Sequence, residues 1–290
     1  MLIYSGLSKF LGTLLRCFSN AIYDTIDHDG AEYAGYLAFL FLLSLFPFLV
    51  FFAAIIGQIA QLLDDNKLWE DFIEFILSYS IPKDVIDGLK PRITEIISKP
   101  PQGVLTLSAA GALWTASSVV EGMRTVLNRA YRVHTPPAYI FRRLLSIVQI
   151  LFITVAMVLA ILSLTVVPIF VDMLSKYFDV KPLLDLIYIR YLFSVAILFF
   201  CAFWLYLTLP NVKQKWRKVM PGTILLVLLW SSTAEALSYY LRSFNQLSII
   251  YGSLAGIIVS MLFFYLISIC FIFCAEFNHN LAKAFSANGP

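Results

Sequence analysis

The chain has 290 residues, of which 60% are hydrophobic and only 13% are charged. A soluble domain carries about a quarter charged residues, because its surface must be solvated. This composition excludes an ordinary soluble domain and predicts an integral membrane protein. The net charge of +3 is no argument for nucleic-acid binding, because the basic residues are needed at helix ends.

The N-terminal segment 1–35 is predicted to be a cytoplasmic amphipathic segment rather than a cleavable signal. Lys9 and Arg16 interrupt its apolar residues, and no small-x-small cleavage site follows them. The pattern favours a helix that lies on the membrane face or packs under a helical bundle. The apolar residues that recur at helical spacing are Leu7, Leu11, Leu14, Leu15, Phe18 and Ile22.

Six apolar stretches follow, each long enough to cross a bilayer as a helix. Crossing ~30 Å of hydrocarbon at 1.5 Å per residue takes about 20 residues, and unpaired strands would leave backbone groups unsatisfied in lipid. We therefore predict an all-α fold: one membrane domain over 1–290, a polytopic bundle of six transmembrane helices plus amphipathic helices. The predicted spans are 36–62, 104–120, 144–171, 191–209, 222–241 and 251–275.

The positions of lysine and arginine predict the orientation of this bundle. The loop 210–219 carries four basic residues and the loop 121–143 carries five arginines, so we expect both loops in the cytoplasm. With six spans, both termini are then cytoplasmic. The arginines of the longer loop are Arg124, Arg129, Arg132, Arg142 and Arg143.

The segment 63–103 is expected outside the membrane on the opposite side. It is rich in Asp and Glu, and its apolar residues follow a helical pattern that prolines interrupt. We interpret it as two short amphipathic helices that cap the external mouth of the bundle. An equally simple interpretation is a lid that only shields helix ends.

A carboxylate and a proline stand out within the predicted spans. Glu235 is a carboxylate inside the fifth span, where its charge must meet the bundle interior, a partner or water. It is either a proton- or substrate-handling group in a central cavity or a carboxylate near the helix end that reaches Arg242 or solvent. Pro47 removes a backbone hydrogen bond in the first span, and the resulting kink lines a cavity, acts as a hinge or only shapes packing.

Enzyme chemistry finds little support in the sequence. The acidic residues before the first span, which include Asp24 and Asp27, could attract a cation, but a helix N-cap at Asp29 is the favoured explanation. No Ser/His/Asp set, Walker loop, dinucleotide fingerprint or His-Glu-x-x-His helix occurs. We therefore predict no catalytic residues, no cofactor and no bound metal.

Several short motifs occur in a fixed order over about residues 20–283. They are Asp29-Gly30-Ala31, Leu43-Ser44-Leu45-Phe46-Pro47, Trp114-Thr115-Ala116-Ser117, Leu127-Asn128-Arg129-Ala130-Tyr131, Leu209-Pro210-Asn211, Met220-Pro221-Gly222, Tyr251-Gly252-Ser253-Leu254 and Ala275-Glu276-Phe277-Asn278. Together they resemble the YihY/BrkB (virulence factor BrkB) family. One departure concerns the fifth span, where Ser231 follows Trp230 in place of an acidic residue and Glu235 comes one turn later.

The resemblance implies a bacterial inner (plasma) membrane protein with six spans and no settled activity. Members have been labelled virulence factors linked to serum resistance, transporters and, in older usage, ribonuclease BN, a transfer-RNA-processing enzyme. We expect a transporter or permease-like protein, with a non-catalytic envelope scaffold that binds a periplasmic protein as the alternative and a ribonuclease as the least favoured. The expected partners are the lipid bilayer and a small-molecule or lipid substrate, without nucleic acid, and a homo-oligomer is compatible with the sequence. The candidate functional positions are Pro47, Asn128, Arg129, Glu235, Tyr251, Gly252 and Glu276.

Overall fold

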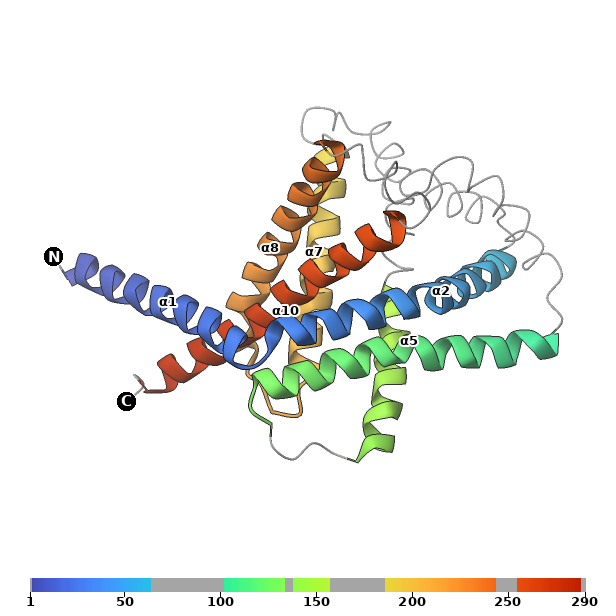
Figure 1. Cartoon of the computed structure of the whole chain (residues 1–290), viewed down its shortest axis with the longest axis horizontal. Helices are drawn as coiled ribbons and strands as arrows, with labels where there is room; N and C mark the ends of the chain where they lie inside the picture. Colours follow the sequence, from blue (N-terminus) through green and yellow to red (C-terminus); the bar gives the residue numbers. More distant parts are fainter. Residues whose placement is uncertain (1, 64–101, 134–137, 157–185, 244–254, 288–290) are drawn as a thin grey trace, which may run out of the picture. The chain divides into compact units, whose positions relative to one another are not determined.

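The computed structural model describes residues 2–63, 102–133, 138–156, 186–243 and 255–287. Within these ranges all the regular secondary structure is helical, which confirms the all-α fold class (Figure 1). The labelled helices are α1 (Leu2–Asp27), α2 (Gly30–Leu63), α5 (Gln102–Ala130), α7 (Leu186–Thr208), α8 (Trp216–Ser243) and α10 (Ala255–Ala287). A further helix covers Tyr139–Ala156.

Three of the described helices are long and apolar enough to cross a membrane: Tyr139–Ala156, Trp216–Leu241 and Gly256–Phe285. Gly30–Leu45 and Val195–Thr208 are apolar but shorter. The full set of six crossings therefore stays a prediction. The expected external helices lie almost wholly in residues 64–101, outside the described residues.

Two helices run further than the apolar stretches suggested. The predicted loop 121–143 begins as helix, because α5 continues to Ala130 and carries Arg124 and Arg129 on its last turns. α10 likewise continues beyond residue 275 to Ala287. A charge-free window marks the apolar part of a helix, whereas the helix itself ends only where the backbone is capped.

The chain divides by its internal contacts into two compact units. One unit contains Met1–Leu43, Val119–Leu145 and Ile187–Pro290, and the other contains Ser44–Ser118 and Ser146–Leu186. The charged side chains described below all belong to the first unit.

In the second unit, α2 and α5 are joined by a polar contact. The Ser44 hydroxyl donates to the Thr115 carbonyl oxygen at 3.1 Å. Pro47 lies inside α2, and its side chain is half-buried. A proline at this position removes one backbone hydrogen bond of the helix, as the sequence predicted.

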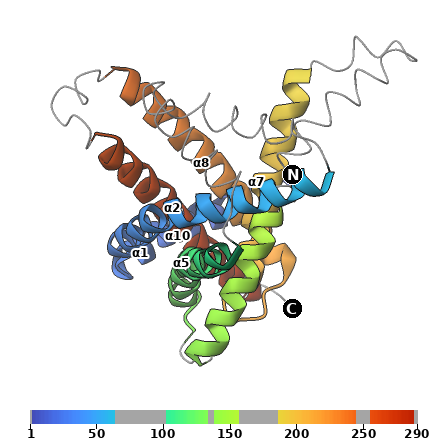
Figure 2. The same cartoon turned by 90° about the vertical axis from the view of Figure 1, so that its right-hand side faces the viewer.

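In the first unit, α10 packs against both α1 and α8 (Figure 1, Figure 2). On α1 the small residues Cys17 and Ala21 are buried against Phe277 and Leu281 of α10. Small side chains let the two helix axes approach closely, so the aromatic ring fills the contact. The N-terminal helix is therefore held to the last helix of the chain.

The contact of α8 with α10 depends on the missing side chain of Gly222. The backbone nitrogen of Gly222 donates to Oδ1 of Asn278 at 2.8 Å, and an added Cβ would lie 2.4 Å from the same amide. Further along, Nε1 of Trp230 donates to the Ile267 carbonyl oxygen at 2.9 Å. The two helices are thus joined by polar contacts at two levels.

Replacing Gly222 by alanine is expected to destabilise the protein by about 1–3 kcal/mol, because the buried Asn278 amide must shift and lose its hydrogen bond. The measurement is the midpoint of thermal unfolding (Tm) of the purified chain in detergent. Gly35→Ala in α2 is the matched control, since a Cβ there meets nothing within 4 Å and gains the same helix propensity. A Tm for Gly222→Ala as high as that of Gly35→Ala would contradict the packing described.

Candidate functional site

The C-terminal end of α5 is built to hold Arg132 in an uncommon backbone conformation. The amide of Val133 donates to the Asn128 carbonyl oxygen at 2.8 Å, and the amide of Arg132 donates to the Arg129 carbonyl oxygen at 3.0 Å. This pair of bonds is a Schellman motif, whose left-handed position is usually glycine. Here Arg132 occupies it with φ 59°, at a cost of about 1–2 kcal/mol for a residue with a side chain.

The turn between α1 and α2 also uses a left-handed residue. Asp29 has φ 57°, and its carbonyl oxygen accepts from the Tyr33 amide at 3.0 Å, so its backbone occupies the N-cap position of α2. Gly30 follows because a Cβ there would lie 2.5 Å from the Thr25 carbonyl oxygen. The Asp29 side chain turns to Arg129, whereas an ordinary N-cap side chain bonds to a helix amide.

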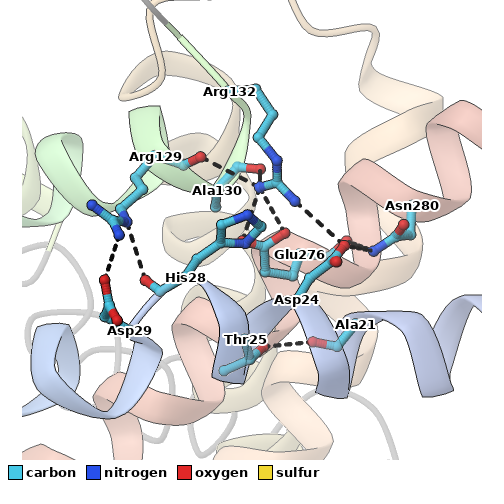
Figure 3. Close-up of polar contacts among 10 residues, drawn as sticks. All are labelled: Ala21, Asp24, Thr25, His28, Asp29, Arg129, Ala130, Arg132, Glu276 and Asn280. Atoms are coloured by element: carbon cyan, nitrogen blue, oxygen red, sulfur yellow. Dashed lines mark hydrogen bonds and ion pairs between the residues drawn. The ribbon is translucent and has the colours of Figure 1, made fainter.

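Four polar side chains from three parts of the chain gather around Glu276 (Figure 3). Nη1 of Arg132 lies 3.0 Å from both carboxylate oxygens of Glu276, and Nδ1 of His28 lies 3.1 Å from Oε1. Nη2 of Arg132 also reaches Oδ2 of Asp24 at 3.3 Å, and Nδ2 of Asn280 donates to the same oxygen at 2.8 Å. We name Asp24, His28, Arg132, Glu276 and Asn280 the Glu276 cluster.

The Glu276 cluster keeps a charge where water hardly reaches. The Glu276 side chain is 1% exposed, whereas that of Arg132 is 30% exposed. A buried carboxylate is tolerated only when it is paired and hydrogen-bonded. Arg132 is therefore shared between two carboxylates, one buried and one partly exposed.

A second arginine, Arg129, binds the turn between α1 and α2 through more exposed contacts. Arg129 pairs with Asp29, donates from Nε to the His28 carbonyl oxygen at 3.1 Å and donates from Nη1 to the Tyr33 hydroxyl at 3.1 Å. Its guanidinium carbon also lies 4.9 Å from the centre of the Tyr33 ring. Since Arg129 and Asp29 are about half-exposed, this pair orients the turn more than it stabilises it.

The inner face of α5 carries a further polar link, to the segment that follows α7. Arg124 is fully buried, donates from Nη1 to the Leu209 carbonyl oxygen at 3.0 Å and lies 3.4 Å from Glu121. Burial lowers the pKa of the Arg124 guanidinium, and Glu121 offsets part of that shift. Next to it, Oδ1 of Asn128 accepts from the Asn211 amide at 2.8 Å.

Between the Glu276 cluster and this link lies Tyr131, at the end of α5. Its ring is 7% exposed and stands edge to face with the ring of His279, with the ring centres 6.2 Å apart. Burial raises the pKa of the Tyr131 hydroxyl, with the nearby Glu276 charge adding to the shift. The hydroxyl therefore stays neutral.

A polar cavity of about 330 Å³ borders the Glu276 cluster. It lies where α1, the end of α5 and the last turns of α10 meet, all in the first unit. Its lining is polar or charged throughout, and it includes three members of the Glu276 cluster. The lining residues are Asn20, Tyr23, Asp24, Arg132, His279, Asn280 and Lys283.

The structure brings together three of the residues singled out from the sequence: Asn128, Arg129 and Glu276. Glu235 is exposed on α8, away from these contacts, and its predicted ion-pair candidate Arg242 shows no described side chain. Pro47 belongs to the other unit. The remaining candidates, Tyr251 and Gly252, lie outside the described residues.

Sequence reasoning missed most partners of Glu276. Arg132 was considered only as a loop charge, and Asp24 only as part of an acidic run. The one local signal was spacing: Asp24 and His28, like Glu276 and Asn280, stand four apart and so share a helix face. In the part of the chain that the structure describes, no group of three His, Cys, Asp or Glu side chains is arranged to hold a metal ion.

An all-helical chain with long apolar helices and a charged cluster at their ends has the make-up of an integral membrane protein. Residues 21–290 match the family model described as virulence factor BrkB, and the chain belongs to this family. No solved structure matches the chain significantly.

Similar proteins occur in distant bacteria. The ribonuclease-like protein YfkH of Bacillus subtilis (strain 168) is 31% identical, over 88% of this chain and 91% of its own length. A UPF0761 membrane protein of Alteromonas mediterranea is 26% identical over 87% of this chain and 83% of its own length. A UPF0761 membrane protein of Vibrio cholerae is 24% identical over 89% and 84%. The UPF0761 relatives are named membrane proteins, and the long apolar helices of this chain agree with a location in a membrane.

Replacing Arg132 by glutamine should destabilise the protein, because Glu276 then remains buried without its main counter-charge. Removing one partner of a buried pair costs about 3–5 kcal/mol, and the partial exposure of Arg132 reduces this to about 2 kcal/mol. Adding Glu276→Gln to the same chain should restore at least half of the lost stability. Thermal unfolding in detergent measures both effects.

The comparison variant is Arg129→Gln, which removes an arginine from the exposed pair and should cost less than about 1 kcal/mol. If Arg132→Gln melts no earlier than Arg129→Gln, or if the double variant is the least stable of all, the buried pair is not what holds the three helix ends together.

Proposed function

We propose that the chain is a transporter or permease-like protein of the bacterial inner (plasma) membrane, with six transmembrane helices and both termini in the cytoplasm. The observation that carries the proposal is the polar cavity beside the Glu276 cluster, at the ends of apolar helices. Glu276 belongs to the apolar helix Gly256–Phe285, and ionisable groups within such helices are costly and commonly mark the path of a solute or ion.

The arrangement of the Glu276 cluster suits a switch between bonding partners. Arg132 pairs with Glu276 at 3.0 Å and with Asp24 at 3.3 Å. A bound ligand that competes with Arg132 for one of these carboxylates therefore changes the pairing of Arg132 with the other. A ligand shifts a conformational equilibrium by its difference in affinity for the two states. Three helices would respond together, because Asp24 belongs to α1, Arg132 follows the end of α5, and Glu276 belongs to α10.

Glu235, on α8, supports the same proposal. It is exposed within the apolar helix Trp216–Leu241. In a bilayer, an exposed carboxylate on such a helix needs water, a partner helix or a ligand. A water-filled path between helices satisfies this need, and we assign Glu235 to that path as a proton- or substrate-handling group.

The proposal includes no chemical reaction. The ribonuclease-like name belongs to the Bacillus relative, and the contacts described here hold helices together and border a cavity. Transport needs neither a nucleophile nor a cofactor.

Transport is tested by efflux from proteoliposomes loaded with a bacterial metabolite extract and containing a fluorescent phospholipid. We expect at least one compound to leave, or the lipid to change leaflet, faster than in protein-free vesicles. Glu235→Gln should slow that movement about ten-fold or more, because it removes the titratable group in the proposed path. Mass spectrometry of the retained compounds and dithionite quenching of the lipid measure the two movements.

Glu32→Gln is the matched control, because Glu32 is an exposed glutamate in the first turn of α2. It should leave the movement unchanged. Retention identical to that of protein-free vesicles, for every compound and for the lipid, would overturn the proposal.

A further inference from the structure

The cavity beside the Glu276 cluster presents many hydrogen-bond donors that are not used within the protein. Among the residues that the structure describes, the side chains of Asn20, Tyr23 and Lys283 make no hydrogen bond or ion pair, and neither ring nitrogen of His279 does. Arg132 uses Nη1 and Nη2, while its Nε has no partner within the same part of the chain. A cavity lined by arginine, lysine and neutral donors suits an anion with several oxygens.

One oxygen of the single carboxylate among the lining residues already accepts two hydrogen bonds. Oδ2 of Asp24 accepts from Asn280 at 2.8 Å and from Arg132 at 3.3 Å. Glu276 lies behind the wall, 1% exposed and bonded to Arg132 and His28. The side chains that reach the cavity with an unused charge or donor are therefore mainly cationic or neutral.

The distribution of residues around α1 indicates the environment to which the cavity opens. At about 100° per residue, its residues fall into three sectors. Cys17, Ala21 and Thr25 are buried, and the first two pack on α10. A second sector is apolar and exposed, with Leu15, Phe18, Ile22 and Ile26 at 65%, 40%, 45% and 74% exposure.

The third sector is polar and contains Asn20 and Asp24, the residues that line the cavity. Tyr23, 70% exposed, stands between the polar and the apolar sectors. A helix with an exposed apolar sector beside a polar one lies in the membrane interface, with its apolar side at the acyl chains. The cavity then opens at the level of the lipid headgroups.

We infer that this cavity binds a phosphate group, and that phosphate carried by a membrane phospholipid is the ligand it fits. Lys283 and Arg132 offset the negative charge of the phosphate, and Asn20 and His279 donate hydrogen bonds to its oxygens. The Tyr23 ring lies between the phosphate and the acyl chains, which contact the apolar sector of α1. Arginine and lysine are the usual phosphate-binding side chains. The inference concerns binding alone and stands separately from transport.

The test is titration of the purified full chain in detergent with dioleoylphosphatidylglycerol, followed by native mass spectrometry. Dioleoylglycerol, which has the same acyl chains and no phosphate, should bind at least ten-fold more weakly. Lys283→Gln and Asn20→Asp should each weaken phosphatidylglycerol binding about five-fold, as expected for one charge at the membrane surface. Both positions are exposed, so neither change removes a packing contact.

Lys215→Gln is the control for overall charge, because Lys215 is exposed and does not line the cavity; it should change binding less than two-fold. Inorganic phosphate separates the two sources of the ligand: displacement of the lipid at millimolar phosphate assigns free phosphate to the cavity, and no displacement assigns the lipid headgroup. Equal binding of dioleoylglycerol, or equal effects of Lys215→Gln and Lys283→Gln, would overturn the inference.

Discussion

The pairing of Arg132 with the buried carboxylate of Glu276 is the contact on which the rest of the first unit depends. The carboxylate is buried on the apolar helix α10, where it is stable only with a counter-charge and hydrogen bonds. Arg132 supplies both, and it can do so because a left-handed backbone directs it toward the two carboxylates. The same guanidinium reaches Asp24, so α1, the end of α5 and α10 are held by one side chain.

The shared ion pair explains why Arg132, and not glycine, occupies the left-handed position after α5. Glycine is the ordinary residue at the left-handed end of a helix, and arginine there costs free energy. Glycine would relieve the backbone but would leave Glu276 and Asp24 without their shared cation. The conformational cost is therefore offset by an ion pair that no other residue in the described turn provides.

The helices were predictable because apolar stretches and helical spacing are local properties. Their ends were not, since α5 continues past its apolar part to the Schellman motif at Arg132 and Val133. The buried Arg124 on this part of α5 is satisfied by the distant Leu209 carbonyl oxygen. The cluster could not be predicted from spacing either. Arg132 lies 144 residues before Glu276 and 108 after Asp24, and nothing local indicates that these charges meet. Glu276 itself was selected through a family resemblance rather than through its chemistry.

The packing of α1 on α10 has a consequence for biogenesis. α1 is synthesised long before α10, yet its buried face is completed by α10, because Cys17 and Ala21 are covered by Phe277 and Leu281. Until α10 is synthesised, Asp24 and Arg132 remain hydrated and can still pair with other groups. A chain that stops short of Glu276 would therefore insert most of its helices and still lack the contact that joins its beginning to its end. Quality-control proteases would meet such a product with its N-terminal helix undocked.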